Sequence, residues 1–199
     1  MYSFSSCSME HCDRPALGTE QFCAQHHPDV ESYVRRMLEN IGDSIIIKDV
    51  NFSGIKLENI QLEGRQLYGC TFSEAIMSNC NFSNTLFRMC FFDFSTLLNT
   101  AFTHSDIQFC SFAGSKLQDC NFTNSELVHN NFNGIETRNC DFSNSGLYNS
   151  RFISACFTDT DFVDCDLKKA YFIDVVQSNV SWKFSNTQEA YYSLAGADL

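Results

Sequence analysis

The sequence lacks any apolar run long enough to span a membrane, and its N-terminus lacks the basic start and apolar stretch of a signal peptide. Basic residues are also scarce. The 199 residues carry 13 Lys and Arg against 24 Asp and Glu, which gives a formal net charge of −11. A nucleic-acid-binding protein needs a basic surface to meet phosphates, so we expect no direct nucleic-acid partner. We expect a cytoplasmic protein with no membrane partner.

The motifs around which catalytic sites are usually assembled are absent as well. The sequence has no glycine-rich phosphate loop, no nucleophile elbow and no segment that pairs a His with a carboxylate. His104 and His129 stand without an evident acidic partner. These absences predict a protein that is not an enzyme.

What the sequence does contain is an apolar residue at almost every fifth position, from about Val50 to Trp182. A period of five matches neither the 3.6-residue period of a helix nor the two-residue period of a strand, so it must mark a repeat unit. The column lapses only at Thr137 and Gln177. Its members before Trp182 are Phe52, Leu57, Leu62, Leu67, Phe72, Met77, Phe82, Phe87, Phe92, Leu97, Phe102, Ile107, Phe112, Leu117, Phe122, Leu127, Phe132, Phe142, Leu147, Phe152, Phe157, Phe162, Leu167 and Phe172.

A second column, two residues before the first, holds mainly small residues such as Ala75, Ser95 and Cys110, and the residue between the columns is often Asn or Asp. The two columns together resemble the pentapeptide repeat, in which a small residue, an Asp or Asn, and a Leu or Phe precede two freer positions. The resemblance covers about two-thirds of the chain. It implies an all-β solenoid, a right-handed quadrilateral β-helix with four pentapeptides in each coil.

Steps of twenty residues support four repeats in each coil. From Phe52 they reach only Phe as far as Phe172, and from Phe82 only Phe until Trp182. The two ladders between these are mainly aliphatic. Like residues should therefore stack at about the 4.8 Å spacing of neighbouring strands, in a rod whose coils contact only their neighbours.

Eleven cysteines look at first like a disulfide framework. Seven of the last eight fall in the small column, however, and only Cys156 does not. We therefore predict that these seven are small buried apolar residues in a reducing compartment. They are Cys70, Cys80, Cys90, Cys110, Cys120, Cys140 and Cys165.

The first three cysteines belong to a segment of different composition, residues 1–28. Cys7, Cys12, Cys23 and His26 have the spacing C-x4-C-x10-C-x2-H, and three thiolates with one imidazole suit a closed, structural Zn²⁺ site. The segment is too short to hold a core of its own, so the metal would supply its folding energy. It resembles small Cys3His zinc knuckles with the string Cys-Asp-Arg-Pro-Ala, then Phe-Cys, then His. His27 is the alternative fourth ligand, His11 is less favoured, and a frayed tail without metal is the other interpretation.

Residues 28–41 predict a short helix, because Pro28 can start it, Gly42 follows it, and apolar residues recur at intervals of three and four. We expect its apolar face to cover the open first coil of the rod, and residues 44–50 to enter that coil as a strand. The predicted divisions are a zinc-knuckle-like segment at 1–28, a capping helix and entry strand at 29–49, the β-helix at 50–182, and a last segment at 183–199.

The last segment loses the register of the repeats, and Ala197-Asp198-Leu199 reads as a fresh repeat two residues out of step. Two interpretations stay open. The segment is a C-terminal cap or dimer contact, so that two copies associate through a coil end, or further repeats follow Leu199.

Several features fall outside the inward columns. Two residues past one central column, a ladder of five Asn and two Asp runs from Asn59 to Asn179, which is most simply a turn-forming device; a polar recognition stripe is the alternative. Acidic residues gather near the C-terminal end as an acidic collar, offset only by Lys168 and Lys169. Bulky apolar residues gather mid-rod, where they either form a partner-binding patch or fold back over the rod. The mid-rod residues are Leu86, Met89, Phe91, Phe94, Leu98 and Phe109; the collar residues are Asp159, Asp161, Asp164, Asp166 and Asp174.

Two functions follow from these features. The first is a non-enzymatic protein–protein interaction scaffold, a rigid rod that docks an unidentified protein. The alternative comes from the resemblance: some acidic pentapeptide-repeat proteins mimic DNA and bind type II topoisomerases such as DNA gyrase. Salt separates the two, because mimicry should weaken with ionic strength and apolar docking should not.

Overall fold

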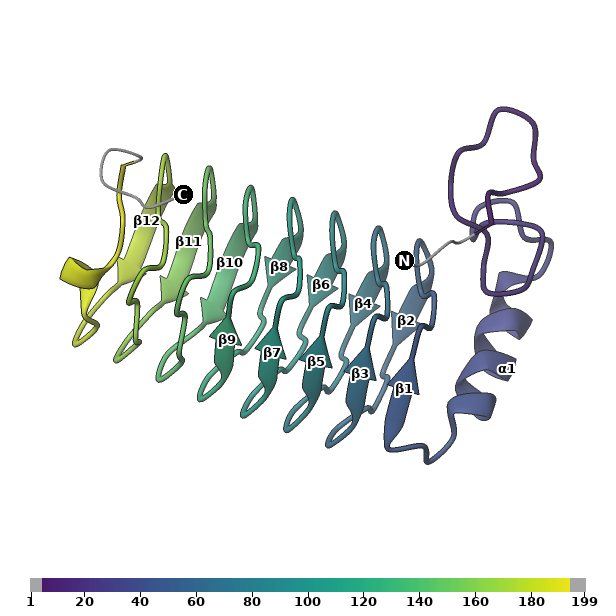
Figure 1. Cartoon of the computed structure of the whole chain (residues 1–199), viewed down its shortest axis with the longest axis horizontal. Helices are drawn as coiled ribbons and strands as arrows, with labels where there is room; N and C mark the ends of the chain where they lie inside the picture. The colour runs from purple at the N-terminus through teal and green to yellow at the C-terminus, as the bar shows by residue number, and fades with distance from the viewer. Residues whose placement is uncertain (1–4, 194–199) are drawn as a thin grey trace.

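The computed structural model describes residues 5–193, which form a straight rod with one α-helix and a loop segment at its N-terminal end (Figure 1). Paired strands are offset by twenty residues throughout: Leu57 pairs with Met77, and Met77 with Leu97, always in parallel. The predicted β-helix of four pentapeptides in each coil is therefore confirmed. No helix within the described residues is long and apolar enough to cross a membrane.

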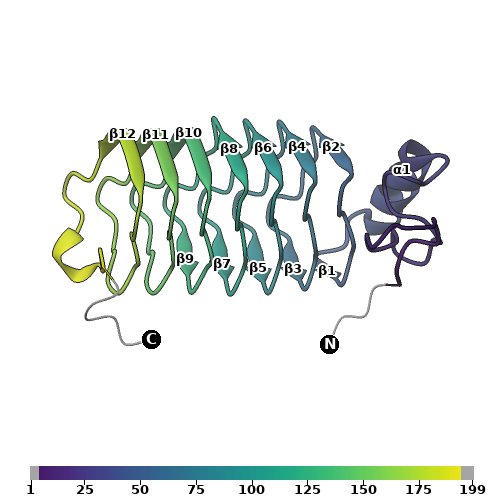
Figure 2. The ribbon, with the colours of Figure 1, turned by 90° about the horizontal axis from the view of Figure 1, so that it is seen from above.

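The strands form two parallel sheets on opposite sides of the rod, as the view from above shows (Figure 2). In spatial order, the five-stranded sheet consists of β1 (Ile46–Lys48), β3 (Gln66–Tyr68), β5 (Leu86–Arg88), β7 (Asp106–Gln108) and β9 (Glu126–Val128). The seven-stranded sheet consists of β12 (Val176–Ser181), β11 (Cys156–Asp161), β10 (Glu136–Asp141), β8 (Lys116–Gln118), β6 (Thr96–Leu98), β4 (Ile76–Ser78) and β2 (Lys56–Glu58).

We name the four sides by their central residues, taken in steps of twenty. Side A runs from Phe52 to Phe172, side B from Leu57 to Gln177, side C from Leu62 to Trp182, and side D from Ile47 to Leu167. Sides B and D carry the two sheets, and β10, β11 and β12 extend the larger sheet onto side C. Side A, and side C in the earlier coils, are joined coil to coil by single bridges such as Asn51 to Thr71.

The core of the rod is built from the rings of sides A and C. Rings on one side stack face to face, as Phe92 and Phe112 do at 4.4 Å and 1° between planes. Rings on opposite sides meet edge to face, as Phe102 and Phe112 do at 6.1 Å and 82°. Both arrangements are favourable for aromatic quadrupoles, and each fully buried ring contributes roughly 1.5–3 kcal/mol by burial.

The small column is buried beside these rings. Most of its hydroxyls donate to backbone carbonyls of the preceding coil, as when the Ser125 hydroxyl donates to the Phe102 carbonyl at 2.8 Å, whereas the Thr100 hydroxyl donates to the Leu98 carbonyl within its own coil. The seven predicted cysteines are buried and unpaired, and Cys156 is half-buried. Burial raises the pKa of Cys80, and it raises the pKa of Cys165 to about 11, so both thiols stay protonated.

The Asn and Asp ladder lies at the corner between sides B and C. All of its members have positive φ, the left-handed conformation that Asn and Asp tolerate better than most residues. Side chains are also bonded along the ladder: Asn99 donates to Asn79 at 2.8 Å, and Asn139 donates to Asp119 at 2.6 Å. Because of this bond, and a second one from Gln118, the pKa of Asp119 is lowered.

The two polar residues that interrupt the apolar column make different hydrogen bonds. Thr137 is buried, and its hydroxyl shares a hydrogen bond with that of Thr160 at 2.8 Å. Gln177 is exposed and accepts a hydrogen bond from the Trp182 indole at 3.0 Å.

Beyond Trp182 the backbone ladder continues although the sequence pattern does not. Tyr191 pairs with Tyr171, and the short 3₁₀ helix η1 (Thr187–Glu189) precedes it. The predicted fresh repeat at Ala197-Asp198-Leu199 lies outside the described residues.

The N-terminal end of the rod is covered by α1 (Val30–Ile41). The helix begins at Asp29, whose carboxylate accepts the Ser32 N–H at 3.0 Å, so Pro28 lies just before it. It ends at Gly42, whose N–H bonds to the Leu38 carbonyl at 2.9 Å. Its apolar face packs against the core of the first coil, as predicted.

Candidate metal centre and interaction surface

Four side chains of the N-terminal loop segment converge at one point. The ligand atoms of Cys7, Cys12, Cys23 and His26 all lie within 4.8 Å of one another. Cys12 Sγ lies 3.9 Å from Cys23 Sγ, and His26 Nδ1 lies 3.5 Å from Cys7 Sγ and 3.6 Å from Cys23 Sγ. A zinc tetrahedron has S–S edges of about 3.8 Å and S–N edges of about 3.6 Å, given its usual bond lengths. The residues present therefore fit a tetrahedral metal ion.

Backbone hydrogen bonds hold the loop in this shape. The Cys7 N–H donates to the Arg14 carbonyl at 2.9 Å, which closes a hairpin with Cys12 in its turn. The Cys12 N–H donates to the Met9 carbonyl at 3.2 Å, and His11 in this turn has φ +61°. The His26 N–H donates to the Cys23 carbonyl at 3.1 Å, and this tight turn brings the last two ligands together.

The thiols of the cluster do not behave alike. The backbone of Arg14 lowers the pKa of the Cys12 thiol, but burial and the neighbouring thiols of Cys23 and Cys7 outweigh it, so that this pKa is raised. Burial raises the pKa of the Cys7 thiol, but the backbone groups of Cys23 and Met9 and the side chain of His26 outweigh it and bring the pKa down to about 6. A thiol with this pKa is largely a thiolate at neutral pH, which is the form that binds metal.

The other two histidines face elsewhere. His27 Nδ1 accepts the Asp29 N–H at 3.1 Å, and its Nε2 lies 3.8 Å from the Glu20 carboxylate. His11 points outward, with Nε2 3.4 Å from Glu10. Of the three histidines near the cysteines, only His26 directs a ring nitrogen at the cluster.

The six predicted mid-rod residues are divided among three sides of the rod. Met89, Phe91, Phe94 and Phe109 lie on side A or at its two corners and are exposed by 52%, 40%, 71% and 56%. Leu98 lies on side B, in β6, at 36%, and Leu86 lies on side D, in β5, where it is half-buried. We call the first four the side-A cluster.

Two side chains of the side-A cluster, Phe94 and Phe109, contact residues of the next coil. A Cβ atom on Gly114, in the next coil, would lie 2.6 Å from the ring of Phe94, so this ring covers the glycine. The Phe109 ring stacks on His129 at 5.1 Å and 5° between planes, and His129 meets Tyr148 edge to face at 5.6 Å. These contacts of His129 and Tyr148 were not predicted, although a step of twenty from Phe109 arrives at His129.

Comparison with known proteins identifies the fold family. A family profile described as Pentapeptide repeats matches the chain in eight copies, over residues 46–84, 66–97, 105–144 and 138–168. The chain belongs to the pentapeptide-repeat family. No curated protein matches it in a sequence search.

Solved structures of pentapeptide-repeat proteins resemble it at low sequence identity. A trypsin-treated form of QnrB1, a plasmid-mediated fluoroquinolone resistance protein, is 16% identical, covers 75% of this chain and 89% of its own, and has a TM-score of 0.57. HetL from Nostoc sp. strain PCC 7120, involved in heterocyst differentiation regulation, is 14% identical, with 83% and 98% covered and a TM-score of 0.34. These similarities concern the fold.

Three residues of the side-A cluster stand at corners of the rod where the backbone turn favours glycine or a short polar residue. Met89, Phe94 and Phe109 have φ values of +52°, +57° and +56°. At the same two corners in other coils the residues with positive φ are all glycine or polar: Asp49, Gly54, Gly69, Glu74, Gly114, His129, Gly134, Asn149, Ser154, Lys169 and Asp174. A left-handed conformation costs an L-residue with a Cβ atom about 1–2 kcal/mol, and short polar residues or glycine reduce that cost. Bulky apolar residues at these corners are therefore not explained by the turn itself.

The acidic collar is exposed, as its sequence suggested. All five aspartates are accessible to solvent in the last two coils. Asp159 accepts a hydrogen bond from Asn179 at 2.7 Å, and Asp166 accepts one from Asn186 at 2.9 Å. These bonds join neighbouring coils, so part of the collar also serves the corners of the rod.

Proposed function

We propose that this pentapeptide-repeat protein is a non-enzymatic scaffold that docks another protein through the side-A cluster. The observation that carries the proposal is the combination of exposure and backbone conformation at Met89, Phe94 and Phe109. Each places a bulky apolar side chain in water at a corner where its own φ is unfavourable. Phe94 contacts Gly114 and Phe109 stacks on His129, but about half or more of each of the three side chains stays exposed, and a partner that buries them accounts for this exposure.

The rest of side A suits an apolar partner. Next to the cluster, its outward residues are small or uncharged, as at Ser111, Ala113 and Asn131. Asp93 is held within the surface, where it accepts hydrogen bonds from the Ser111 hydroxyl and the Ala113 N–H. Side A therefore offers small residues between aromatic edges, and the nearest exposed carboxylate at its A–B corner is Glu74, one coil before Phe94, which pairs with Arg14.

Affinity capture from the source cells tests this function. We expect the double variant Phe91→Asp/Phe109→Asp to lose a protein that the wild type retains. The matched control is Asn121→Asp/Asn124→Asp, which adds the same charge on side C, at an outward position and a corner with positive φ. A partner retained equally by all three baits would contradict docking through the side-A cluster.

We also propose that Cys7, Cys12, Cys23 and His26 bind one structural Zn²⁺. The tetrahedral fit of their ligand atoms supports this, and four protein ligands leave no open position for catalysis. Metal analysis of protein purified without chelator should find one zinc per chain. His26→Ala should lose it and His27→Ala should keep it; the reverse result would make His27 the ligand, and a metal-free wild type would refute the site.

The second candidate function is binding to a type II topoisomerase such as DNA gyrase by mimicry of DNA. The exposed acidic collar favours it, since a surface of carboxylates can replace phosphates. Purified gyrase offers the test. Binding that falls steeply between low and moderate salt and survives Phe91→Asp/Phe109→Asp would select this function over the side-A scaffold.

The remaining assignments are proposals of the same kind. The loop segment at 1–28, the cap at 29–49, the rod at 50–182 and the segment at 183–199 are the proposed functional divisions. We propose the cytoplasm as the location, because reduced thiols in the small column and a thiolate metal site suit a reducing compartment.

A further inference from the structure

The N-terminal end of the rod presents the free edges of both sheets. β1 is the first strand of one sheet and β2 is the first strand of the other. The Gln66 N–H donates to the Ile45 carbonyl at 2.8 Å, and the Asp49 N–H donates to the Tyr68 carbonyl at 2.9 Å. Successive residues of a strand direct their backbone groups to opposite sides, so Ile46 and Lys48 direct theirs away from β3.

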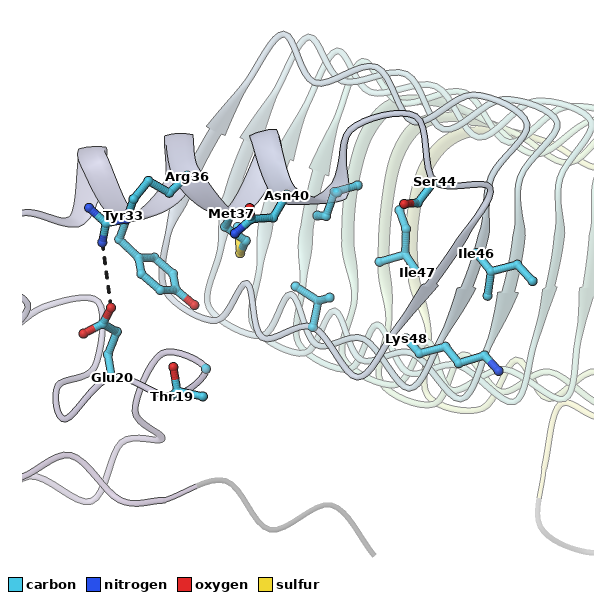
Figure 3. Close-up of a pocket in the computed structure, with 13 residues that line it drawn as sticks. Thr19, Glu20, Tyr33, Arg36, Met37, Asn40, Ser44, Ile46, Ile47 and Lys48 are labelled. Carbon is cyan, nitrogen blue, oxygen red and sulfur yellow. Dashed lines mark ion pairs between the residues drawn. The ribbon is translucent and has the colours of Figure 1, made fainter.

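A groove lies on this free side of β1, between the strand and α1 (Figure 3). It has a volume of about 510 Å³. Met37, Ile41 and Ile47 give it apolar walls, while Arg36 and Lys48 add positive charge. Arg36 is partly neutralised by Glu20, 3.8 Å away. The groove thus combines a strand edge, an apolar surface and a basic rim.

α1 lies beside both edges, with a groove between the helix and each strand. The two edges differ in charge, because the outward residues are Lys56 and Glu58 in β2 but Ile46 and Lys48 in β1. Lys56 and Glu58, the two outward residues of β2, form an ion pair at 2.5 Å, and charged residues on an edge strand discourage pairing. At the equivalent position in β1 stands Ile46, which is 51% exposed, and Ile45 before it is 63% exposed. An exposed apolar edge of this kind is a template for an added strand.

The occupant that best fits this edge is a pentapeptide strand, and residues 194–199 have that pattern. Ala197-Asp198-Leu199 repeats the order of a small residue, an acidic residue and a central Leu. In parallel register, Ala197 would meet Ile45 and Leu199 would meet Ile47, the small and central columns of side D. Asp198 would approach the basic rim of the groove.

These residues cannot reach the β1 edge of their own chain. Seven coil-to-coil steps separate Asn51 from Tyr191, which amounts to about 34 Å along the rod. Six extended residues span only about 20 Å. We therefore propose that residues 194–199 of a second copy add a strand to β1, so that copies associate head to tail. This contact is heterologous, and it is independent of the side-A cluster.

Sedimentation of the 199-residue chain across a range of concentrations tests the proposal. We expect the average mass to rise with concentration, and to fall back to that of one chain when residues 194–199 are removed. Ile46→Pro should abolish the association, because it removes an N–H that points into the groove and bonds to no residue of β3. Lys56→Pro is the matched control at the equivalent position of β2 and should still associate.

A fluorescent peptide of residues 192–199 gives a second measurement on the truncated chain. We expect Ile46→Pro to weaken peptide binding at least tenfold, and a peptide with Leu199→Asp to bind no better than a scrambled one. Should Ile46→Pro fail to fold, Leu199→Asp in the full chain keeps the test decisive. A chain that stays monomeric, an association that survives truncation, or equal losses in the two proline variants would each overturn the proposal.

Discussion

The rod and the loop segment before it reach a defined structure by opposite means. Within residues 5–28, the fully buried apolar side chains are Cys7, Ala16, Leu17 and Cys23, and two of these belong to the metal cluster. In the rod, every coil buries a ring or an aliphatic side chain on nearly every side. The rod is stable because each coil repeats the contacts of the last, whereas the loop segment has little core, and under the proposed zinc site its structure would depend on four ligands meeting at one point.

The largest expected effect is the unfolding of the loop segment while the rod stays folded. Removal of the metal by a chelator, or Cys23→Ser, should unfold residues 5–28 and leave the rod intact, since structural zinc contributes roughly 10–16 kcal/mol in comparable small domains. Hydrogen exchange with metal analysis would measure this. Cys156→Ser, a half-buried cysteine of the rod, is the control. Unchanged protection of residues 5–28 without metal would contradict the comparison.

A cavity in the core should instead destabilise the rod and leave the loop segment folded. Phe112→Ala removes a ring that stacks on Phe92 and Phe132, and we expect the free energy of unfolding to fall by about 3–5 kcal/mol with metal still bound. Phe109→Ala, three residues away and exposed, should change it by less than about 0.5 kcal/mol. Denaturant unfolding of the two variants distinguishes them. Equal midpoints would show that the ring stack does not govern the stability of the rod.

The junction between the two regions should give a smaller effect. Asn51 is buried, donates to the Ala16 carbonyl at 2.9 Å and accepts the Ser53 N–H at 2.8 Å. Asn51→Ala should cost about 1–3 kcal/mol and increase exchange around residue 16 without loss of metal. Asn121→Ala is the control, because Asn121 accepts the equivalent N–H of Thr123 but is exposed. Loss of metal in Asn51→Ala would mean that the rod helps to form the cluster.

The smallest expected effect is the loss of stability at low pH that arises from Asp119. The pKa of Asp119 is lowered in the folded rod, chiefly by the hydrogen bond from Asn139. A lowered pKa means that its contribution to stability is complete above the unfolded value and is lost as pH falls through the folded value. Following the Asp119 carboxyl by NMR titration should place its midpoint below 3.8, the ordinary value. Asp119→Asn should keep the corner and remove this pH dependence; a midpoint at or above 3.8 would refute the bond.

The rod could be predicted because its repeat interval is visible in the sequence. Phe112 follows Phe92 by twenty residues, and the same interval sets the strand register. The metal cluster could be predicted only as a set of residue types and spacings. The spacing favoured His26 and left His27 as the alternative. The turn at Cys23 and the Asp29 N–H that His27 accepts distinguish the two histidines, and neither shows in the spacing. The six mid-rod residues were predicted either to form one patch or to fold back over the rod, but exposure depends on which side of the rod each residue occupies.

The twenty-residue register also constrains how such a protein can change its length. One inserted residue would turn every apolar column downstream out of the core, so a change of this size is not tolerated within a coil. An insertion of twenty residues, by contrast, adds one whole coil and moves the far end by about 4.8 Å without rotating any side. The distance between a docking surface and either end of the rod can therefore change only by whole coils, and each surface stays on the same side of the rod.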